Sequence, residues 1–309
     1  MASPVSLSFR SAPSIVPSYL RVVFHKKVPL LPKDTTLPRL EAVLARFQAK
    51  RERVDAYRAV CGGESSDTLP VAYPHVLAMP VQLALMSSSA FPVRLMGLVH
   101  LRNHIEQRRP LRVGEVGRLR VWIEGHRETN VGQEFDVNTS VEIDGQPVWQ
   151  ETCVFMARRM TREKRYAGRI AAGEGIPAPD AESVQPDSPE SVRTMSFEAD
   201  EGIGWRYARV SSDFNPIHLS KLGARMFGFN QPIAHGMWSM ARCLAALNSD
   251  TFAGAKRVDV VFKRPVTIPA PLTLETWHTQ NGAGFALKGT DRGKMHVAGS
   301  VVPLAATRR

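Results

Sequence analysis

The sequence has no long apolar run and very little cysteine. Its longest apolar candidate, 77–85, is interrupted by Pro80 and is much shorter than the roughly 18 residues that a membrane-spanning helix needs. Three cysteines, Cys61, Cys153 and Cys243, stand far apart, so they form neither a Cys-x-x-Cys site nor a disulfide framework. These absences exclude a transmembrane protein, predict no membrane insertion, and favour a reducing, cytoplasmic setting.

The sequence is rich in basic residues, but its densest basic segment has few aromatic residues among them. The chain of 309 residues has 40 Lys and Arg against 29 Asp and Glu, which gives a net charge of +11. Such a balance favours a polyanionic ligand. The densest basic run, 158–165, lacks the interleaved aromatics of a nucleic-acid stacking surface, so no nucleic-acid partner is expected. A small molecule rich in phosphate accounts for the charge equally well.

The chain contains an internal duplication, which is informative about domain organisation. Three pairs of segments match in the same order: 108–122 with 263–277, 77–86 with 232–241, and 145–154 with 293–302. The first two pairs share an offset of 155 residues (263 − 108), whereas the third pair needs a seven-residue deletion. In each copy an apolar helix precedes several strands. This order predicts an α+β unit, with the helix packed on one antiparallel sheet.

Composition divides the chain into three segments. Residues 1–164 are expected to form an N-terminal unit and residues 193–309 a C-terminal unit, with 165–192, rich in Pro, Gly and Ala, as the linker. We expect the two sheets to join edge to edge into one rigid, continuous antiparallel sheet. Within the first unit, residues 19–24 are interpreted as a strand.

Residues 211–218, Ser-Ser-Asp-Phe-Asn-Pro-Ile-His, form the segment with the clearest chemistry. Pro216 disfavours a helical conformation at Asn215, so the segment is predicted to be a fixed loop. Such a loop can aim the Asp213 carboxylate and the His218 imidazole at one point. A carboxylate and an imidazole held together are suited to general acid–base catalysis.

Gly236 marks a second point of interest, the start of a helix predicted to run from after Pro232 to near Asn248. Free N–H groups at a helix N-terminus stabilise a developing oxyanion, and glycine lets a substrate carbonyl approach the backbone closely. Between the two points, Ser220 is expected to N-cap a short helix that Gly228 ends.

The segment 211–218, followed by the helix start at Gly236, resembles the hydratase 2 motif of the MaoC-like family, and the duplication resembles its double-hotdog members. The resemblance implies a double hotdog, and an activity like that of (R)-specific enoyl-CoA hydratases and 3-hydroxyacyl dehydratases. It implies that Asp213 and His218 are the catalytic pair. It further implies that Asn215 supports them and that Gly236 donates its N–H to the thioester oxygen.

The resemblance also implies how the reaction proceeds. In hydration, His218 is expected to take a proton from water while Asp213 delivers one to the α-carbon on the same face. No metal and no cofactor is expected, because coenzyme A or acyl carrier protein enters as part of the substrate. Substrate binding is expected from four further residues: His235, Ser212, Lys263 and Arg264. The last two follow a predicted strand and suit the phosphates of coenzyme A.

Two features depart from the family pattern. Ser212 stands where family members commonly have glycine, so the loop is expected to need a changed backbone dihedral. In the first half, Pro80 and Val81 fall at the positions of His235 and Gly236, and no Asp-x-Asn-Pro-x-His occurs there. The first half is therefore expected to be a degenerate hotdog that binds the acyl chain or is purely structural.

Rival interpretations remain open at this stage. A hotdog acyl-CoA thioesterase would share the helix and sheet but hydrolyse the thioester, and a non-catalytic acyl-CoA-binding protein would keep only the cavity. His100 and His104 stand four apart without an intervening acid, so we interpret them as strand residues rather than metal ligands. The chain is expected to act as a monomer of two hotdogs or as a homodimer.

Overall fold

The computed structural model describes residues 5–24, 27–32, 35, 37, 39–159, 191–247, 249–290 and 293–304. Eleven strands form one sheet in the order β1-β2-β4-β5-β6-β3-β8-β11-β10-β9-β7. The first half contributes β1 (Val5–Phe9), β2 (Leu40–Gln48), β3 (Leu98–Gln107), β4 (Val116–Thr129), β5 (Gly132–Ile143) and β6 (Gln146–Arg158). The second half contributes β7 (Arg193–Ala199), β8 (Lys256–Phe262), β9 (Ala270–Thr279), β10 (Gly282–Gly289) and β11 (Met295–Pro303).

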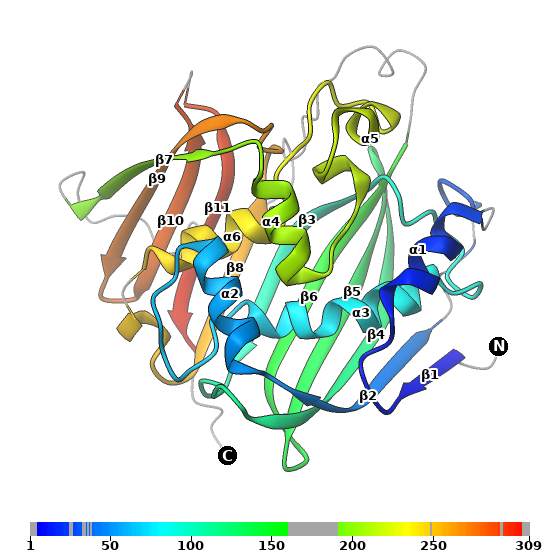
Figure 1. The fold of residues 1–309 in the computed structure, drawn as a ribbon, viewed down its shortest axis with the longest axis horizontal. Coiled ribbons are helices and arrows are strands. Elements are labelled where there is room, and N and C mark those ends of the chain that lie inside the picture. The colour runs from blue at the N-terminus through cyan, green and yellow to red at the C-terminus, as the bar shows by residue number, and fades with distance from the viewer. Residues whose placement is uncertain are drawn as a thin grey trace.

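Helices pack on the sheet (Figure 1). They are α1 (Ile15–Phe24), α2 (Arg51–Cys61), α3 (Tyr73–Ser87), α4 (Ile203–Ser211), α5 (Lys221–Met226) and α6 (Gly236–Ala245). Helix α3 packs against strands of the first half and α6 against β10 of the second, so each half has a central helix on its own part of the sheet. None of the helices in the described ranges is long and apolar enough to cross a bilayer.

The two halves meet through their strands. Strand β3 pairs antiparallel with β8, from Arg102 opposite Val261 to Gln107 opposite Lys256. The expected edge-to-edge junction is therefore confirmed, but the sheet is not antiparallel throughout, because β1 pairs with β2 in parallel. The repeat is also visible in the turns that precede β6 and β11, where Gly145 and Gly293 both adopt positive φ, 76° and 57°. Both halves thus follow one α+β plan.

The core lies between the helices and the sheet. Helix α6 buries one apolar stripe, which includes Met237, Met240, Ala241 and Leu244, as its 3.6-residue period predicts. The helix ends at Ala245, and the expected cap residue Asn248 lies outside the described residues. Helix α3 is buried over most of its surface because it lies under the neighbouring helices as well as on the sheet.

Three expectations need comment. Residues 19–24 are not a strand but the end of α1, which packs against α3, and this packing decides between two conformations that a short apolar segment allows equally. In the first half, Pro80 and Val81 do not stand at a helix start, because α3 begins seven residues earlier, at Tyr73. Almost all of the expected linker 165–192 lies outside the described residues.

Candidate active site

The loop after α4 holds the candidate carboxylate in place. Helix α4 ends at Ser211, and Ser212 adopts a left-handed conformation, φ 65° and ψ 14°, which turns the chain sharply. The N–H of Asp213 donates to Ser211 Oγ at 3.2 Å, and Asp213 Oδ1 accepts from the N–H of Asn215 at 3.1 Å. Asn215 Oδ1 in turn accepts from the N–H of Ile217 at 3.4 Å. Asn215 therefore supports the loop by capping the following turn.

The candidate histidine has a defined tautomer. His218 Nδ1 donates to the main-chain oxygen of Ile233 at 2.7 Å, which assigns the proton to Nδ1 and leaves Nε2 as an acceptor. The His218 ring stacks on His235, with centroids 3.7 Å apart. His235 Nε2 donates to the main-chain oxygen of Asp213 at 3.0 Å. Ring or carboxylate atoms of Asp213, His218 and His235 all lie within 4.8 Å of one another.

The surroundings determine which of these groups is charged. Burial tends to raise the pKa of Asp213, but the nearby His235 and His218 outweigh it, so the pKa lies below its usual value. Burial lowers the pKa of His218, with Asp213 opposing it, and burial next to His218 lowers the pKa of His235 to about 3. At neutral pH the site therefore holds a carboxylate and two neutral imidazoles. Both Asp213 and His218 are ready to accept a proton.

Gly236 is the first residue of α6, and the first N–H groups of a helix have no partner within it. A Cβ at this position would lie 3.3 Å from the ring of Phe262, tighter than nearly all real contacts. Glycine therefore lets the backbone lie close to this ring, and an added Cβ would require the ring to shift by a few tenths of an ångström. The expectation that Gly236 faces the site agrees with its place in the lining of the cavity.

One cavity of about 530 Å³ contains these groups and lies between the two halves. Asp213, His218 and Gly236 line it from the second half. The first half contributes residues of α3, β3 and β6, among them His75, Met79, Gln82, Leu83, Met86, His100 and Phe155.

The expected substrate-binding residues divide into two groups. His235 and Arg264 line the cavity, whereas Ser212 and Lys263 are not among the described residues that do so. The N–H of Lys263 donates to the main-chain oxygen of His296 at 2.8 Å, which fixes the end of β8. Ser212 acts through the backbone, because its left-handed conformation directs the following carboxylate.

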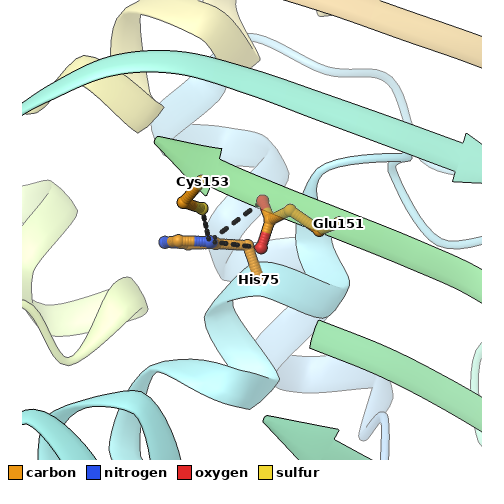
Figure 2. A group of neighbouring side chains, drawn as sticks. All are labelled: His75, Glu151 and Cys153. Carbon is orange, nitrogen blue, oxygen red and sulfur yellow. Dashed lines mark hydrogen bonds and ion pairs between the residues drawn. The ribbon is translucent and has the colours of Figure 1, made fainter. Parts of the chain in front are cut away.

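Sequence reasoning missed three residues near this site. The hydroxyl of Tyr19 accepts from the N–H of Phe214 at 2.6 Å and lies 3.5 Å from Asp213 Oδ1. In the first half, His75 Nδ1 lies 2.9 Å from Glu151 Oε2, and His75 lines the same cavity (Figure 2). These residues are 76 or more positions from their partners, so no local spacing could indicate them.

Among the residues that the structure describes, two clusters have atoms of the kind that hold metal ions: His75 with Glu151 and Cys153, and Asp213 with His218 and His235. In the first, the pKa of the Cys153 thiol is raised well above its usual value, chiefly by burial, which disfavours the thiolate that a metal needs. In the second, both histidines already donate to main-chain oxygens. The expectation of a reaction without metal stays a prediction.

Comparison with known proteins gives a consistent result. The family model for the MaoC like domain matches residues 184–299. The 3-hydroxyacyl-thioester dehydratase X of Mycobacterium tuberculosis is 30% identical over 274 residues, which cover 89% of this chain and 93% of that protein. The peroxisomal hydratase-dehydrogenase-epimerase of Neurospora crassa is 29% identical over 143 residues, 46% of this chain but only 15% of that protein.

A solved structure extends this likeness to three dimensions. The crystal structure of HtdX from Mycobacterium tuberculosis superposes with a TM-score of 0.71 at 28% identity, covering 85% of this chain and 100% of that chain. The sequence match covers nearly the full length of the mycobacterial dehydratase, and the fold matches over both halves. The chain therefore belongs to the MaoC-like dehydratase family.

Proposed function

We propose that the protein catalyses the reversible hydration of trans-2-enoyl thioesters to (R)-3-hydroxyacyl thioesters, and is thus a hydro-lyase. The observation that carries the proposal is the meeting of the Asp213 carboxylate, the His218 imidazole and the helix start at Gly236 in one cavity. A relative that is similar over 93% of its own length is named a 3-hydroxyacyl-thioester dehydratase, which supports the same reaction.

In the dehydration direction, the thioester oxygen accepts a hydrogen bond from the N–H of Gly236, so that negative charge developing on it is stabilised. The Asp213 carboxylate takes the proton from the α-carbon, a role that its lowered pKa supports. His218, whose Nε2 is free to take up a proton, gives this proton to the 3-hydroxyl, which leaves as water when the C–O bond breaks. Both groups come from one short loop, as a syn elimination requires.

In the hydration direction the same groups exchange tasks. His218 Nε2 takes a proton from the attacking water as its oxygen bonds to the β-carbon, and the carboxyl of Asp213 returns a proton to the α-carbon. Since Asp213 rests as a carboxylate, it must first gain that proton, so hydration should be faster at lower pH within the range where the fold is stable. This requirement modifies the simple expectation that Asp213 begins hydration as the acid.

The substrate carrier follows from charge and cavity shape. We propose that the acyl group enters between α3 and the Asp213 loop, and that Arg264 at the mouth binds phosphate of coenzyme A, with acyl carrier protein as the alternative carrier. The first half then lines the acyl chain with Met79, Leu83 and Met86. Three free, buried cysteines support a reducing compartment such as the cytoplasm.

The decisive experiment uses crotonyl-CoA and two readouts, loss of the conjugated thioester absorbance and release of free thiol. Absorbance loss without thiol is the expected result. Thiol release would instead indicate a thioesterase, and neither signal with crotonyl-CoA or longer enoyl-CoAs would indicate a binding protein. Asp213→Asn and His218→Ala should each lower turnover by about 10²–10⁴-fold. Asp67→Asn and His278→Ala are matched controls outside the cavity and should leave turnover unchanged.

A further inference from the structure

Tyr19 brings a hydroxyl from the first half of the chain to the loop that carries Asp213. It lies in α1, which packs against α3 of the first half (Figure 1). Its side chain lines the cavity together with Asp213 and His218. The N–H of Phe214 donates to its hydroxyl oxygen at 2.6 Å, and the same oxygen lies 3.5 Å from Asp213 Oδ1. One phenol thus contacts two successive residues of the loop, which stand 194 and 195 positions further along the chain.

The direction of these hydrogen bonds follows from the groups involved. A tyrosine hydroxyl has one proton to donate, and a carboxylate can only accept. Because the hydroxyl oxygen already accepts from the N–H of Phe214, its proton is directed toward Asp213 Oδ1. Burial and the neighbouring Asp213 carboxylate raise the pKa of Tyr19 well above its usual value, so the phenol keeps its proton. The distance of 3.5 Å is long for such a bond, and hydrogen bonds to catalytic groups commonly tighten when the substrate binds.

The two oxygens of the Asp213 carboxylate lie in different surroundings. Oδ1 accepts from the N–H of Asn215 at 3.1 Å and from the hydroxyl of Tyr19. Oδ2 lies 3.8 Å from Nε2 of His235, which is too far for a hydrogen bond, and that nitrogen donates instead to the main-chain oxygen of Asp213. In the described part of the chain, no group donates a hydrogen bond to Oδ2. Oδ1 is therefore the anchored oxygen, and Oδ2 is the oxygen left for the substrate.

The two donors to Oδ1 do not have the same effect. A base acts efficiently only when its accepting atom is held in line with the proton, and a carboxylate rotates about its Cβ–Cγ bond unless one oxygen is fixed. The N–H of Asn215 belongs to the same loop as Asp213 and moves with it. Tyr19 belongs to a helix that packs against the first half, so its hydroxyl ties the carboxylate to the opposite wall of the cavity.

We propose that Tyr19 is a positioning residue, whose hydroxyl holds Oδ1 of Asp213 so that Oδ2 takes the α-proton. This proposal rests on the proposed function. The α C–H bond breaks, its proton passes to Oδ2, and its electron pair forms the new C=C bond. The C–O bond breaks toward oxygen, which departs as water with the proton that His218 gives to it. Tyr19 neither gains nor loses a proton, because it acts through Asp213.

The test measures both directions of the reaction, with (R)-3-hydroxybutyryl-CoA and crotonyl-CoA as substrates. Y19F removes only the hydroxyl and keeps the ring. It should lower kcat about tenfold in each direction, because a hydrogen bond to a charged group is lost, while KM changes by less than about threefold. Y19M, a second apolar variant, should show the same loss. L20A is the matched control, since Leu20 is the next residue of α1 and its side chain is exposed, and it should leave kcat and KM unchanged.

A double-mutant cycle with Asp213 distinguishes positioning of the carboxylate from support of the loop. If Tyr19 acts through the carboxylate, Y19F should lower the residual turnover of D213N by less than about threefold, although it lowers that of the wild type about tenfold. A hydroxyl that merely maintains the shape of the loop would lower turnover by the same factor in both backgrounds, because the residual rate still depends on His218 and Gly236.

The outcomes separate this inference from the function on which it rests. If the wild-type protein converts neither substrate, nor longer enoyl-CoAs, the proposed function itself fails. If the wild type is active but Y19F and Y19M, folded by their thermal transitions, retain kcat, then Tyr19 does not position the base. A raised KM with unchanged kcat would make Tyr19 a contact for the substrate, and an equal loss in the D213N background would make it a support of the loop. Either result would overturn the proposal.

Discussion

Replacing Ser212 by glycine should stabilise the protein without changing any side-chain contact. Ser212 has φ 65°, a conformation that costs an L-residue roughly 1–2 kcal/mol, whereas glycine adopts it without strain. Part of this gain is lost, because glycine adds roughly 0.5–1 kcal/mol of conformational freedom to the unfolded chain. The net expectation is that Ser212→Gly raises the free energy of unfolding by about 0.5–1 kcal/mol.

Urea unfolding followed by circular dichroism measures this difference, with Ser212→Ala as the matched control. Alanine removes the hydroxyl but keeps the Cβ, so the strain remains and the stability should stay within about 0.5 kcal/mol of the wild type. If Ser212→Gly is no more stable than Ser212→Ala, backbone strain at this position is not what distinguishes the loop. The catalytic rate of the glycine variant should be at least that of the wild type, because Asp213 is also held by the N–H of Asn215.

Three further predictions follow from the site. Gly236→Ala should lower kcat/KM, measured by steady-state kinetics, about tenfold or more, because the added methyl group obstructs the position of the oxyanion. The stability should fall little, although the methyl group also contacts the Phe262 ring. Arg264→Ala should raise the KM for crotonyl-CoA several-fold, and less so at high salt, while Lys263→Ala should not. Stability should fall as pH drops below about 6.5, because the unfolded chain binds protons that the buried, neutral His100 and His235 do not. Each contributes a slope of up to about 1.4 kcal/mol per pH unit, and His100→Phe should flatten the stability profile measured by urea unfolding.

Local patterns in the sequence predicted most of the fold but only some of the polar groups in the cavity. The repeat across 108–122 and 263–277 predicted equivalent strands, because a turn followed by alternating apolar residues is a local signal. Asp213 and His218 were predictable for the same reason, since they lie five positions apart in one loop. Helix α1 was not predictable, because the segment 19–24 is too short for hydrophobic periodicity to distinguish a helix from a strand.

The missed residues depend on tertiary packing. His75 meets Glu151 only because α3 lies across β6, 76 positions further along the chain. The duplication also obscured this relation. By sequence it aligns Val81 with Gly236, but α3 begins at Tyr73, so the two helix starts do not coincide at this offset, and His75 lies in the first turn of α3.

The halves should therefore depend on each other for both folding and catalysis. An isolated segment 193–309 would expose the edge of β8, which in the full chain pairs with β3, and would leave the buried Asp259 without His104, its partner at 2.7 Å. Trp238 of α6 would also lose the main-chain oxygen of Val60, to which its ring nitrogen donates at 3.1 Å. An unpaired strand edge and an uncovered helix face promote aggregation.

We expect residues 193–309 expressed alone to be poorly soluble or inactive, and the intact chain to hold one active site. The second expectation follows because only one half has the Asp213 loop and a helix that starts at Gly236, while α3 passes through the equivalent place as continuous helix. Calorimetric titration with a tight, unreactive acyl-CoA analogue should give one site per chain. Two equal sites would mean that the first half has a ligand site of its own. Full activity from the isolated second half would mean that the β3–β8 junction is not needed for the reaction, and the expected dependence of the halves on each other would then be wrong.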